Sequence, residues 1–290
     1  MTAAWPNEHG QQPAIIAQTR DGVAVLTLNR PSSLNAWTPA MGTLYFDTLE
    51  RVTADPSVRA ILVMGAGRAF CAGADMSGLS HIASTGGLAQ NRDPRRYWYA
   101  MSIGKPIVAA IHGPCLGVGL QQALCCDVRF AAADAQIAAP YAKRGLIGEV
   151  GITWMLSRIA GVGHAMDLLV SGRTIGAREA LAMGIVNQVF EPEDLFPRAL
   201  EYCAKLAVEC SPWSMRMLKQ QVYHDLMTAL PSAFDRSEQM LNEALAGQDF
   251  ADAIAAFRQK RAHTFAPLSP QLARLDPWPE GRELSAHSYD

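Results

Sequence analysis

Hydrophobic and polar positions in the first part of the chain predict two strands, a helix and a third strand. The apolar runs at residues 14–18 and 23–29 are joined by Asp21-Gly22, a dipeptide typical of tight β-hairpins. Thr38-Pro39 supplies an N-cap and a first-turn proline for a helix that we expect to extend to about Thr53. An apolar strand follows at residues 59–64. The predicted order is therefore ββαβ.

The middle of the chain repeats this pattern, and the last third departs from it. A strand at 107–111, a glycine-rich turn, a helix at 118–126 and a strand at 128–131 follow one another. Short strands that alternate with helices predict an α/β fold with parallel pairing. From about residue 194, helical periodicity dominates through 261, with breaks at Ser211-Pro212, Leu230-Pro231 and Gly247. We therefore expect several packed helices in this part.

These patterns divide the chain into four parts. We expect a flexible polar tail at 1–12, an α/β core at 13–193, a helical region at 194–265 and an extended surface tail at 266–290, which contains several prolines.

Composition narrows the class of protein. The 290 residues are 49% hydrophobic and 18% charged, which is enough apolar material for a sizeable core. A net charge of −2 gives no electrostatic footprint for nucleic acid. No apolar run approaches the length of a membrane span, and the N-terminus lacks the features of a secretory or organelle signal, so we expect a cytoplasmic protein. The six cysteines show no CxxC spacing, so neither a disulfide framework nor a metal site is expected.

Two loops of small residues are the strongest candidates for chemistry. Residues 65–70 superficially match a dinucleotide fingerprint, but Phe70 stands where a third glycine or alanine is needed. The loops at 70–76 and 112–119 each follow an apolar strand and lead to a helix, where unpaired backbone N–H groups can meet an anion or a polarised carbonyl. Either loop alone could be only a tight turn. The two loops together, at this spacing, indicate a binding site more specifically than either loop alone.

With these loops, the chain resembles the crotonase superfamily, the enoyl-CoA hydratase/isomerase family. The resemblance is carried by residues 28–36, 69–76, 105–127, Gly172 with 177–186, and 257–265. It implies a spiral core of repeated ββα units and a C-terminal helical region that forms a trimer, often doubled to a hexamer. It also implies an acyl-CoA thioester substrate, with no cofactor besides the coenzyme A of that substrate.

The resemblance also implies where the substrate binds. In the family, two backbone N–H groups hold the thioester oxygen, and the matching donors are Ala72 and Val118. Asp75 can also be read as an ordinary helix cap, and His112 as a structural rather than catalytic residue. The residues matched to substrate or CoA contacts are Arg30, Ala36, Ala74, Asp75, Met76, Gly117, Phe257 and Lys260.

The catalytic acids depart from the family pattern. A typical hydratase has two glutamates, and their positions hold Gln121 and Tyr141 here. A neutral amide and a phenol cannot simply replace two carboxylates as acid and base. Glu149 lies on the loop where some relatives place a catalytic aspartate. We expect Glu149 to be the single acid/base and Gln121 or Tyr141 to orient water or substrate, although Glu149 can also be read as a charge near a helix start.

These residues predict hydration of a 2-enoyl-CoA as the leading function. Double-bond isomerisation is the alternative that a single carboxylate performs more easily, because one base can remove a proton and return it elsewhere. Thioester hydrolysis is a further option. The loss of both glutamates also leaves open a protein that binds acyl-CoA without turnover.

Overall fold

The computed structural model describes residues 13–85 and 93–275, so the predicted tail at 1–12 and most of the one at 266–290 lie outside it. The predicted hairpin is confirmed as β1 (Ile15–Arg20) and β2 (Val23–Leu28), which pair antiparallel. Asp21 and Gly22 between them have φ of 50° and 78°. Positive φ at both central residues is what a type I′ hairpin turn requires.

The first helix and third strand are also confirmed. Helix α1 spans Pro39–Ala54, and the Thr38 side chain accepts a hydrogen bond of 3.2 Å from the Met41 amide as its N-cap. Strand β3 (Ala60–Gly65) follows and pairs parallel with β2. The chain then forms α2 (Met76–Thr85) and the 3-10 helix η2 (Tyr97–Ser102).

Two successive ββα units build the middle of the molecule. The first contains β4 (Ile107–Ile111), β5 (Pro114–Leu116) and α3 (Val118–Leu124). The second contains β6 (Val128–Ala132), β7 (Gln136–Ala138) and α4 (Ile152–Ile159). The first strand of each unit joins a six-stranded sheet of order β1-β2-β3-β4-β6-β9, and the second joins a three-stranded sheet of order β5-β7-β8. This arrangement is the predicted α/β fold of repeated ββα units.

The remaining elements complete both sheets and cover them. They are η1 (Pro31–Ser33), η3 (Ala142–Arg144), α5 (Val162–Ser171), β8 (Thr174–Gly176), α6 (Ala177–Ala182), β9 (Gln188–Phe190), α7 (Pro192–Glu209), α8 (Pro212–Asp225), α9 (Leu230–Ala246), α10 (Gln248–Gln259) and η4 (Pro270–Leu272). Among the described helices, none is both long enough and apolar enough to cross a membrane.

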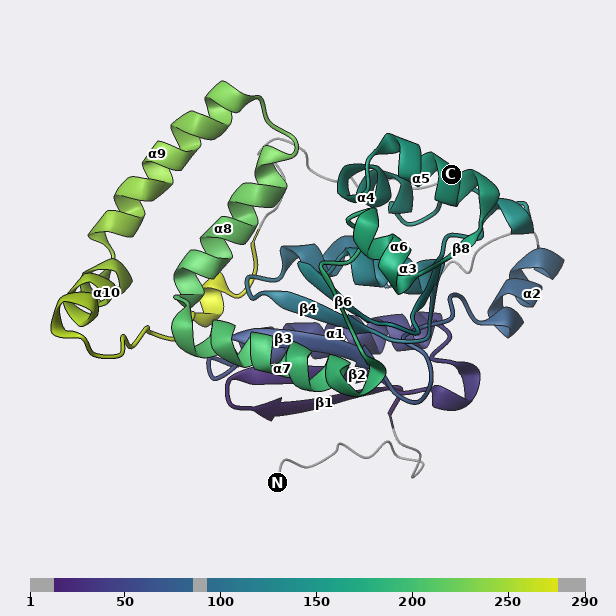
Figure 1. Ribbon diagram of the computed structural model, residues 1–290, viewed down its shortest axis with the longest axis horizontal. Coiled ribbons are helices and arrows are strands. Elements are labelled where there is room, and N and C mark those ends of the chain that lie inside the picture. The colour runs from purple at the N-terminus through teal and green to yellow at the C-terminus, as the bar shows by residue number, and fades with distance from the viewer. Residues whose placement is uncertain (1–12, 86–92, 276–290) are drawn as a thin grey trace.

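Alternating side chains of the six-stranded sheet build two hydrophobic clusters. On one face, Leu62, Val108 and Phe130 pack with Leu195 and Ala199 of α7. Figure 1 shows α7 lying across this face of the sheet. On the other face, strand residues pack with buried side chains of α1 and α3. Because strand residues point alternately to opposite faces, hydrophobic runs such as β4, buried along its whole length, belong to a sheet covered on both sides.

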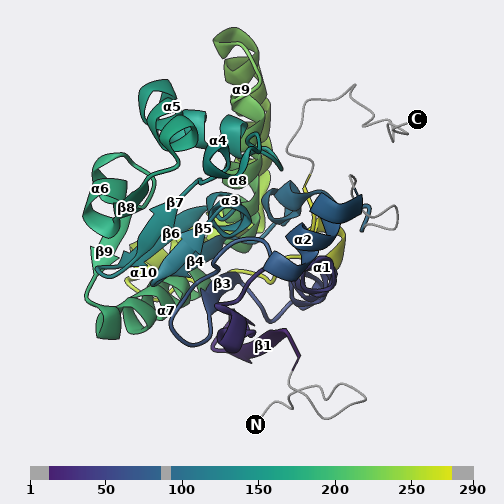
Figure 2. The same cartoon turned by 90° about the vertical axis from the view of Figure 1, so that its right-hand side faces the viewer.

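The C-terminal helices extend away from this core. Figure 1 shows α8, α9 and α10 projecting to the side opposite α2, and Figure 2, which views the molecule from the α2 side, shows α9 rising above the sheets. The segment after α10 is less exposed than the surface tail we expected. Leu268, Ala273 and Leu275 are buried, and the Gly104 amide donates to the Ala273 carbonyl at 2.8 Å. Apolar side chains in a proline-containing stretch therefore anchor residues 266–275 to the core.

A buried polar network joins α8 to the sheet. The Asp127 carboxylate accepts hydrogen bonds from the Ile107 amide at 2.7 Å, from Lys219 Nζ at 2.8 Å and from the Tyr223 hydroxyl at 2.8 Å. Burial raises the pKa of Tyr223, which keeps its hydroxyl protonated and able to donate. The side chain of Lys219 is only 6% exposed, so Asp127 is its neutralising partner inside the protein.

Replacing Asp127 by Ala should lower the free energy of unfolding by about 3–5 kcal/mol, because it leaves the buried Lys219 charge without a counter-ion. Urea unfolding followed by circular dichroism measures this loss. Asp134→Ala is the matched control, since Asp134 is exposed just after β6 and its loss should cost less than about 0.5 kcal/mol. Equal effects of the two substitutions would contradict a structural role for the network.

Candidate active site

The two loops of small residues lie side by side. Cys71 and Cys115 form a parallel β-bridge, in which the Cys71 amide donates to the Pro114 carbonyl and the Leu116 amide donates to the Cys71 carbonyl, each at 3.0 Å. One residue earlier, the Phe70 amide donates to the His112 carbonyl at 2.8 Å. Segments more than 40 residues apart are thereby held in register.

Glycine permits this close approach. A β-carbon on Gly119 would lie 2.4 Å from the Cys71 carbonyl oxygen, closer than any side chain can come. Gly73 has φ of +101°, and a β-carbon there would lie 3.2 Å from the Leu116 carbonyl oxygen. Side chains at either position would force the loops apart.

The second loop presents a free amide at the start of α3. Val118 is the first residue of the helix, and the preceding Gly117 has φ of 52° and ψ of −119°. The first amides of a helix have no partner within it, and the Val118 amide has none among the described residues. The structure therefore leaves this predicted donor available.

The first loop requires a correction. The Ala72 amide donates to the Leu34 carbonyl at 3.0 Å, so it is already occupied. Ala74, which we expected only as a substrate contact, pairs with Trp37 in a parallel bridge through the groups of its neighbours, Gly73 and Asp75. Its own amide has no hydrogen-bond partner in the described part of the chain. Ala74 is therefore the better candidate for a donor, and only the pairing with Trp37, which is not visible in a motif, reveals it.

Gln121 lies on α3, and the Tyr141 hydroxyl lies near the glycine that precedes this helix. Both are buried, with exposed fractions of 1% and 5%. The Tyr141 hydroxyl lies 4.0 Å from the position that a β-carbon on Gly117 would take, and Gln121 Nε2 lies 3.8 Å from the corresponding position on Gly151. Tyr141 therefore lies beside the second loop, and Gln121 faces the loop that leads into α4.

Glu149 acts electrostatically on Tyr141. Burial first, and then the negative charge of Glu149, raise the pKa of Tyr141 well above its usual value. Glu149 itself is exposed in the single chain and belongs to a loop that enters α4 through Val150 and Gly151, with φ of 50° and 83°. These two residues, with left-handed backbone conformations, turn the chain directly after Glu149. They therefore set the position of the Glu149 backbone relative to α4.

The Arg30 side chain links Ala36 to Asp75 beside the first loop. Arg30 Nη2 contacts Asp75 Oδ2 at 3.0 Å, and its Nη1 donates to the Ala36 carbonyl. The other Asp75 oxygen accepts from the Ser77 amide at 3.1 Å at the start of α2. The Ser77 hydroxyl, followed by Arg30, holds the pKa of Asp75 below its usual range. Asp75 is therefore the helix cap that we weighed against ligand contact, and Met76 after it is exposed.

The structure does not bring every matched residue to this site. Phe257 and Lys260 lie on and just after α10, on the opposite side of the molecule from α2 (Figure 1). His112 Nε2 donates a hydrogen bond of 3.0 Å to the Gly67 carbonyl, which fits the structural role. In residues 13–85 and 93–275, no three His, Cys, Asp or Glu side chains gather as metal ligands would.

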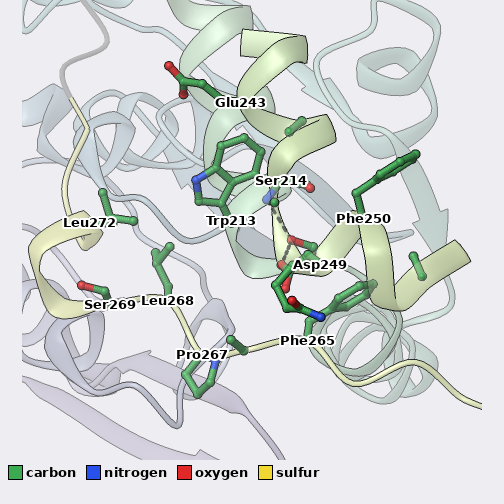
Figure 3. Close-up of a pocket in the computed structure, with 16 residues that line it drawn as sticks. Trp213, Ser214, Glu243, Asp249, Phe250, Phe265, Pro267, Leu268, Ser269 and Leu272 are labelled. Carbon is green, nitrogen blue, oxygen red and sulfur yellow. Dashed lines mark hydrogen bonds between the residues drawn. The ribbon is translucent and has the colours of Figure 1, made fainter. Parts of the chain in front are cut away.

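A separate cavity of about 580 Å³ lies among the C-terminal helices. Figure 3 shows Trp213 of α8 in its wall, with Phe265 and Leu268 from the segment after α10. Its polar groups include Ser211, whose hydroxyl donates to Asp249. None of the predicted site residues lines this cavity, so it is distinct from the candidate active site.

Comparison with known proteins supports one family throughout. The family model for enoyl-CoA hydratase/isomerase matches residues 18–267. A short-chain-enoyl-CoA hydratase of Clostridium acetobutylicum is 32% identical over 85% of this chain and 95% of its own. A 1,2-epoxyphenylacetyl-CoA isomerase of Escherichia coli is 30% identical over 87% and 97%. The crystal structure of an enoyl-CoA hydratase from Mycobacterium marinum is 45% identical and covers 74% of this chain and 99% of its own, with a TM-score of 0.64.

Replacing Gly119 by Ala should lower the free energy of unfolding by about 1–3 kcal/mol, because the new methyl group would overlap the Cys71 carbonyl. Gly163→Ala, in α5, is the control, since a β-carbon there meets nothing within 4 Å. It should be neutral or stabilising by up to about 1 kcal/mol. Chemical denaturation of both variants measures the difference, and a Gly119→Ala variant as stable as the wild type would disprove the tight contact.

Proposed function

Since the chain belongs to the enoyl-CoA hydratase/isomerase family, we propose that it is an acyl-CoA enzyme and that its reaction is the hydration of 2-enoyl-CoA thioesters. The observation that carries the proposal is the position of the Val118 amide. This amide has no partner among the described residues, and it directly follows Gly117, whose β-carbon position lies 4.0 Å from the Tyr141 hydroxyl. The charge of Glu149 in turn acts on Tyr141.

The thioester oxygen is held by the amides of Val118 and Ala74. Both amides are without partners among the described residues, and the bridge between the two loops fixes one relative to the other. When the β-carbon of an enoyl thioester is attacked, negative charge builds up on this oxygen. Preorganised donors then stabilise the enolate by about 3–4 kcal/mol each, because they need no reorganisation during the reaction.

Glu149 moves the protons. As a general base it accepts a proton from the water that adds to the β-carbon, and as a general acid it returns one to the α-carbon. Gln121 and Tyr141 orient the reacting groups without changing charge. The raised pKa of Tyr141 supports this division, because the phenol stays protonated through the neutral range.

Double-bond isomerisation is the second candidate. The specific observation in its favour is that neither Gln121 nor Tyr141 carries a charge at neutral pH, whereas Glu149 is a carboxylate whose charge acts on Tyr141. One carboxylate suffices to take a proton from one carbon and return it to another, so isomerisation makes fewer demands on this site than hydration.

Incubation with a panel of 2-enoyl- and 3-enoyl-CoA esters, followed by mass spectrometry, tests the reaction. We expect the 2-enoyl esters to gain one water, and Glu149→Gln to lower this rate by at least about 100-fold. Glu193→Gln on α7, also an exposed glutamate, is the matched control and should keep the wild-type rate. An absorbance change on the 3-enoyl esters without a gain of water would indicate isomerisation instead. Undiminished turnover by Glu149→Gln would rule out its role.

Infrared difference spectroscopy tests the two amide donors. The carbonyl stretch of butyryl-CoA labelled with ¹³C at the thioester should move to lower frequency on binding, because two N–H groups polarise the bond. An unchanged frequency in a saturated complex would contradict an oxyanion hole at Ala74 and Val118.

A further inference from the structure

The Arg30 guanidinium lies at one end of a series of hydrogen bonds that ends at the Ala74 amide. Arg30 Nη1 donates to the Ala36 carbonyl, and the Trp37 amide donates to the Gly73 carbonyl at 2.7 Å. The Ala36 carbonyl and the Trp37 amide belong to one peptide group, and the Gly73 carbonyl and the Ala74 amide belong to another. Two peptide groups therefore connect a side-chain charge to an amide that has no partner among the described residues.

The planar peptide bond gives each group in this series a fixed direction. No peptide bond among the described residues is cis, so the carbonyl and the amide of one peptide group point to opposite sides. By holding the Ala36 carbonyl, Arg30 orients the Trp37 amide. By holding the Gly73 carbonyl, the Trp37 amide then orients the Ala74 N–H group. A contact of the Arg30 side chain is thereby transmitted to the direction of the Ala74 donor.

The series also transmits charge. A cation that donates to a carbonyl draws electrons towards the oxygen and makes the N–H of the same peptide group more positive. Hydrogen bonds in such a series strengthen one another by about 10–30% each, and a charged donor strengthens the first of them further. The Ala74 N–H is therefore a stronger donor than an amide that lies outside such a series. This matters most where negative charge develops on a bound oxygen.

Asp75 holds the guanidinium in place. Arg30 Nη2 contacts Asp75 Oδ2 at 3.0 Å, and the two side chains are only 28% and 16% exposed, so water screens the ion pair incompletely. The Asp75 amide donates to the Trp37 carbonyl at 3.0 Å, which ties the two segments together on the other side of Ala74. The planar fork of the guanidinium suits two fixed acceptors, and Ala36 and Asp75 supply both.

We propose that Arg30 is a positioning residue, whose guanidinium orients the Ala74 amide through two peptide groups and strengthens it as a donor to the thioester oxygen. This inference rests on the proposed function, because it takes the thioester oxygen to lie on the amides of Ala74 and Val118. It assigns Arg30 to the oxyanion hole instead of to coenzyme A, the contact that the family resemblance implies.

Infrared difference spectra of bound butyryl-CoA, labelled with ¹³C at the thioester carbonyl, test this role. In a saturated complex, the shift of the carbonyl stretch should be smaller in Arg30→Ala than in the wild type by at least about 20%, because the Ala74 donor is weakened. The rate of α-proton exchange should fall about tenfold, a part of the loss expected for removing a whole donor. The dissociation constant of free coenzyme A, which has no thioester carbonyl, should stay the same.

Arg173→Ala is the matched control. Arg173 also bridges two carboxylates, those of Asp167 on α5 and Glu179 on α6. This variant should keep the wild-type carbonyl shift, exchange rate and coenzyme A affinity. An equal loss in Arg173→Ala and Arg30→Ala would overturn a specific role for Arg30.

Arg30→Gln separates the hydrogen bond from the charge. Its side-chain amide is a neutral donor, so it can replace the contact with Ala36 without the cation. We expect a carbonyl shift between those of the wild type and Arg30→Ala. If Arg30→Ala does not fold, Arg30→Gln decides the test, and a wild-type shift in this variant would overturn the assignment.

The remaining outcomes separate this inference from the proposed function. A wild-type carbonyl shift in Arg30→Ala, together with weaker binding of free coenzyme A, would overturn the inference and identify Arg30 as a coenzyme A contact. It would leave the oxyanion hole intact. A wild-type protein that is saturated with butyryl-CoA and shows no carbonyl shift would instead overturn the proposed oxyanion hole together with the inference.

Discussion

The bridge between Cys71 and Cys115 is the contact on which the candidate site depends. It brings together two loops that leave different strands, and it is possible only because Gly119 has no side chain to meet the Cys71 carbonyl. The covered six-stranded sheet fixes the strands from which these loops emerge. Two backbone donors, at Ala74 and Val118, can then be fixed in space largely by contacts of the main chain. The chemistry of the site is thus set first by the backbone and only afterwards by the residues around it.

Elements with local signals were predictable from the sequence. The Asp21-Gly22 turn, the Thr38 cap and strand β4 follow from neighbouring residues, and the structure confirms them. Val118 was matched as a donor through the family resemblance, and its amide at the start of α3 has no partner among the described residues. The choice between Ala72 and Ala74 was not predictable, because hydrogen bonds to Leu34 and Trp37 decide which amide is occupied. Burial of residues 268–275 likewise depends on contacts that are distant in sequence.

The side chains at the site differ in burial and in charge. Gln121 and Tyr141 are buried where a carboxylate would be costly to ionise, whereas Glu149 stands on an exposed loop where its charge is solvated. Burial keeps the Tyr141 phenol protonated, and its hydroxyl has no hydrogen-bond partner among the described residues. In the proposed mechanism, Gln121 and Tyr141 therefore orient the reacting groups and Glu149 transfers the protons.

The most direct test of enolate formation at this site is the exchange of α-protons in a bound saturated thioester. Butyryl-CoA is incubated with the protein in deuterated water, and incorporation at the α-carbon is followed by mass spectrometry. Exchange by the wild type that is lost in Glu149→Gln is the expected result, because the amides of Ala74 and Val118 stabilise the enolate that Glu149 generates. A wild-type protein that binds butyryl-CoA and exchanges no α-proton would contradict this and identify a protein that only binds acyl-CoA.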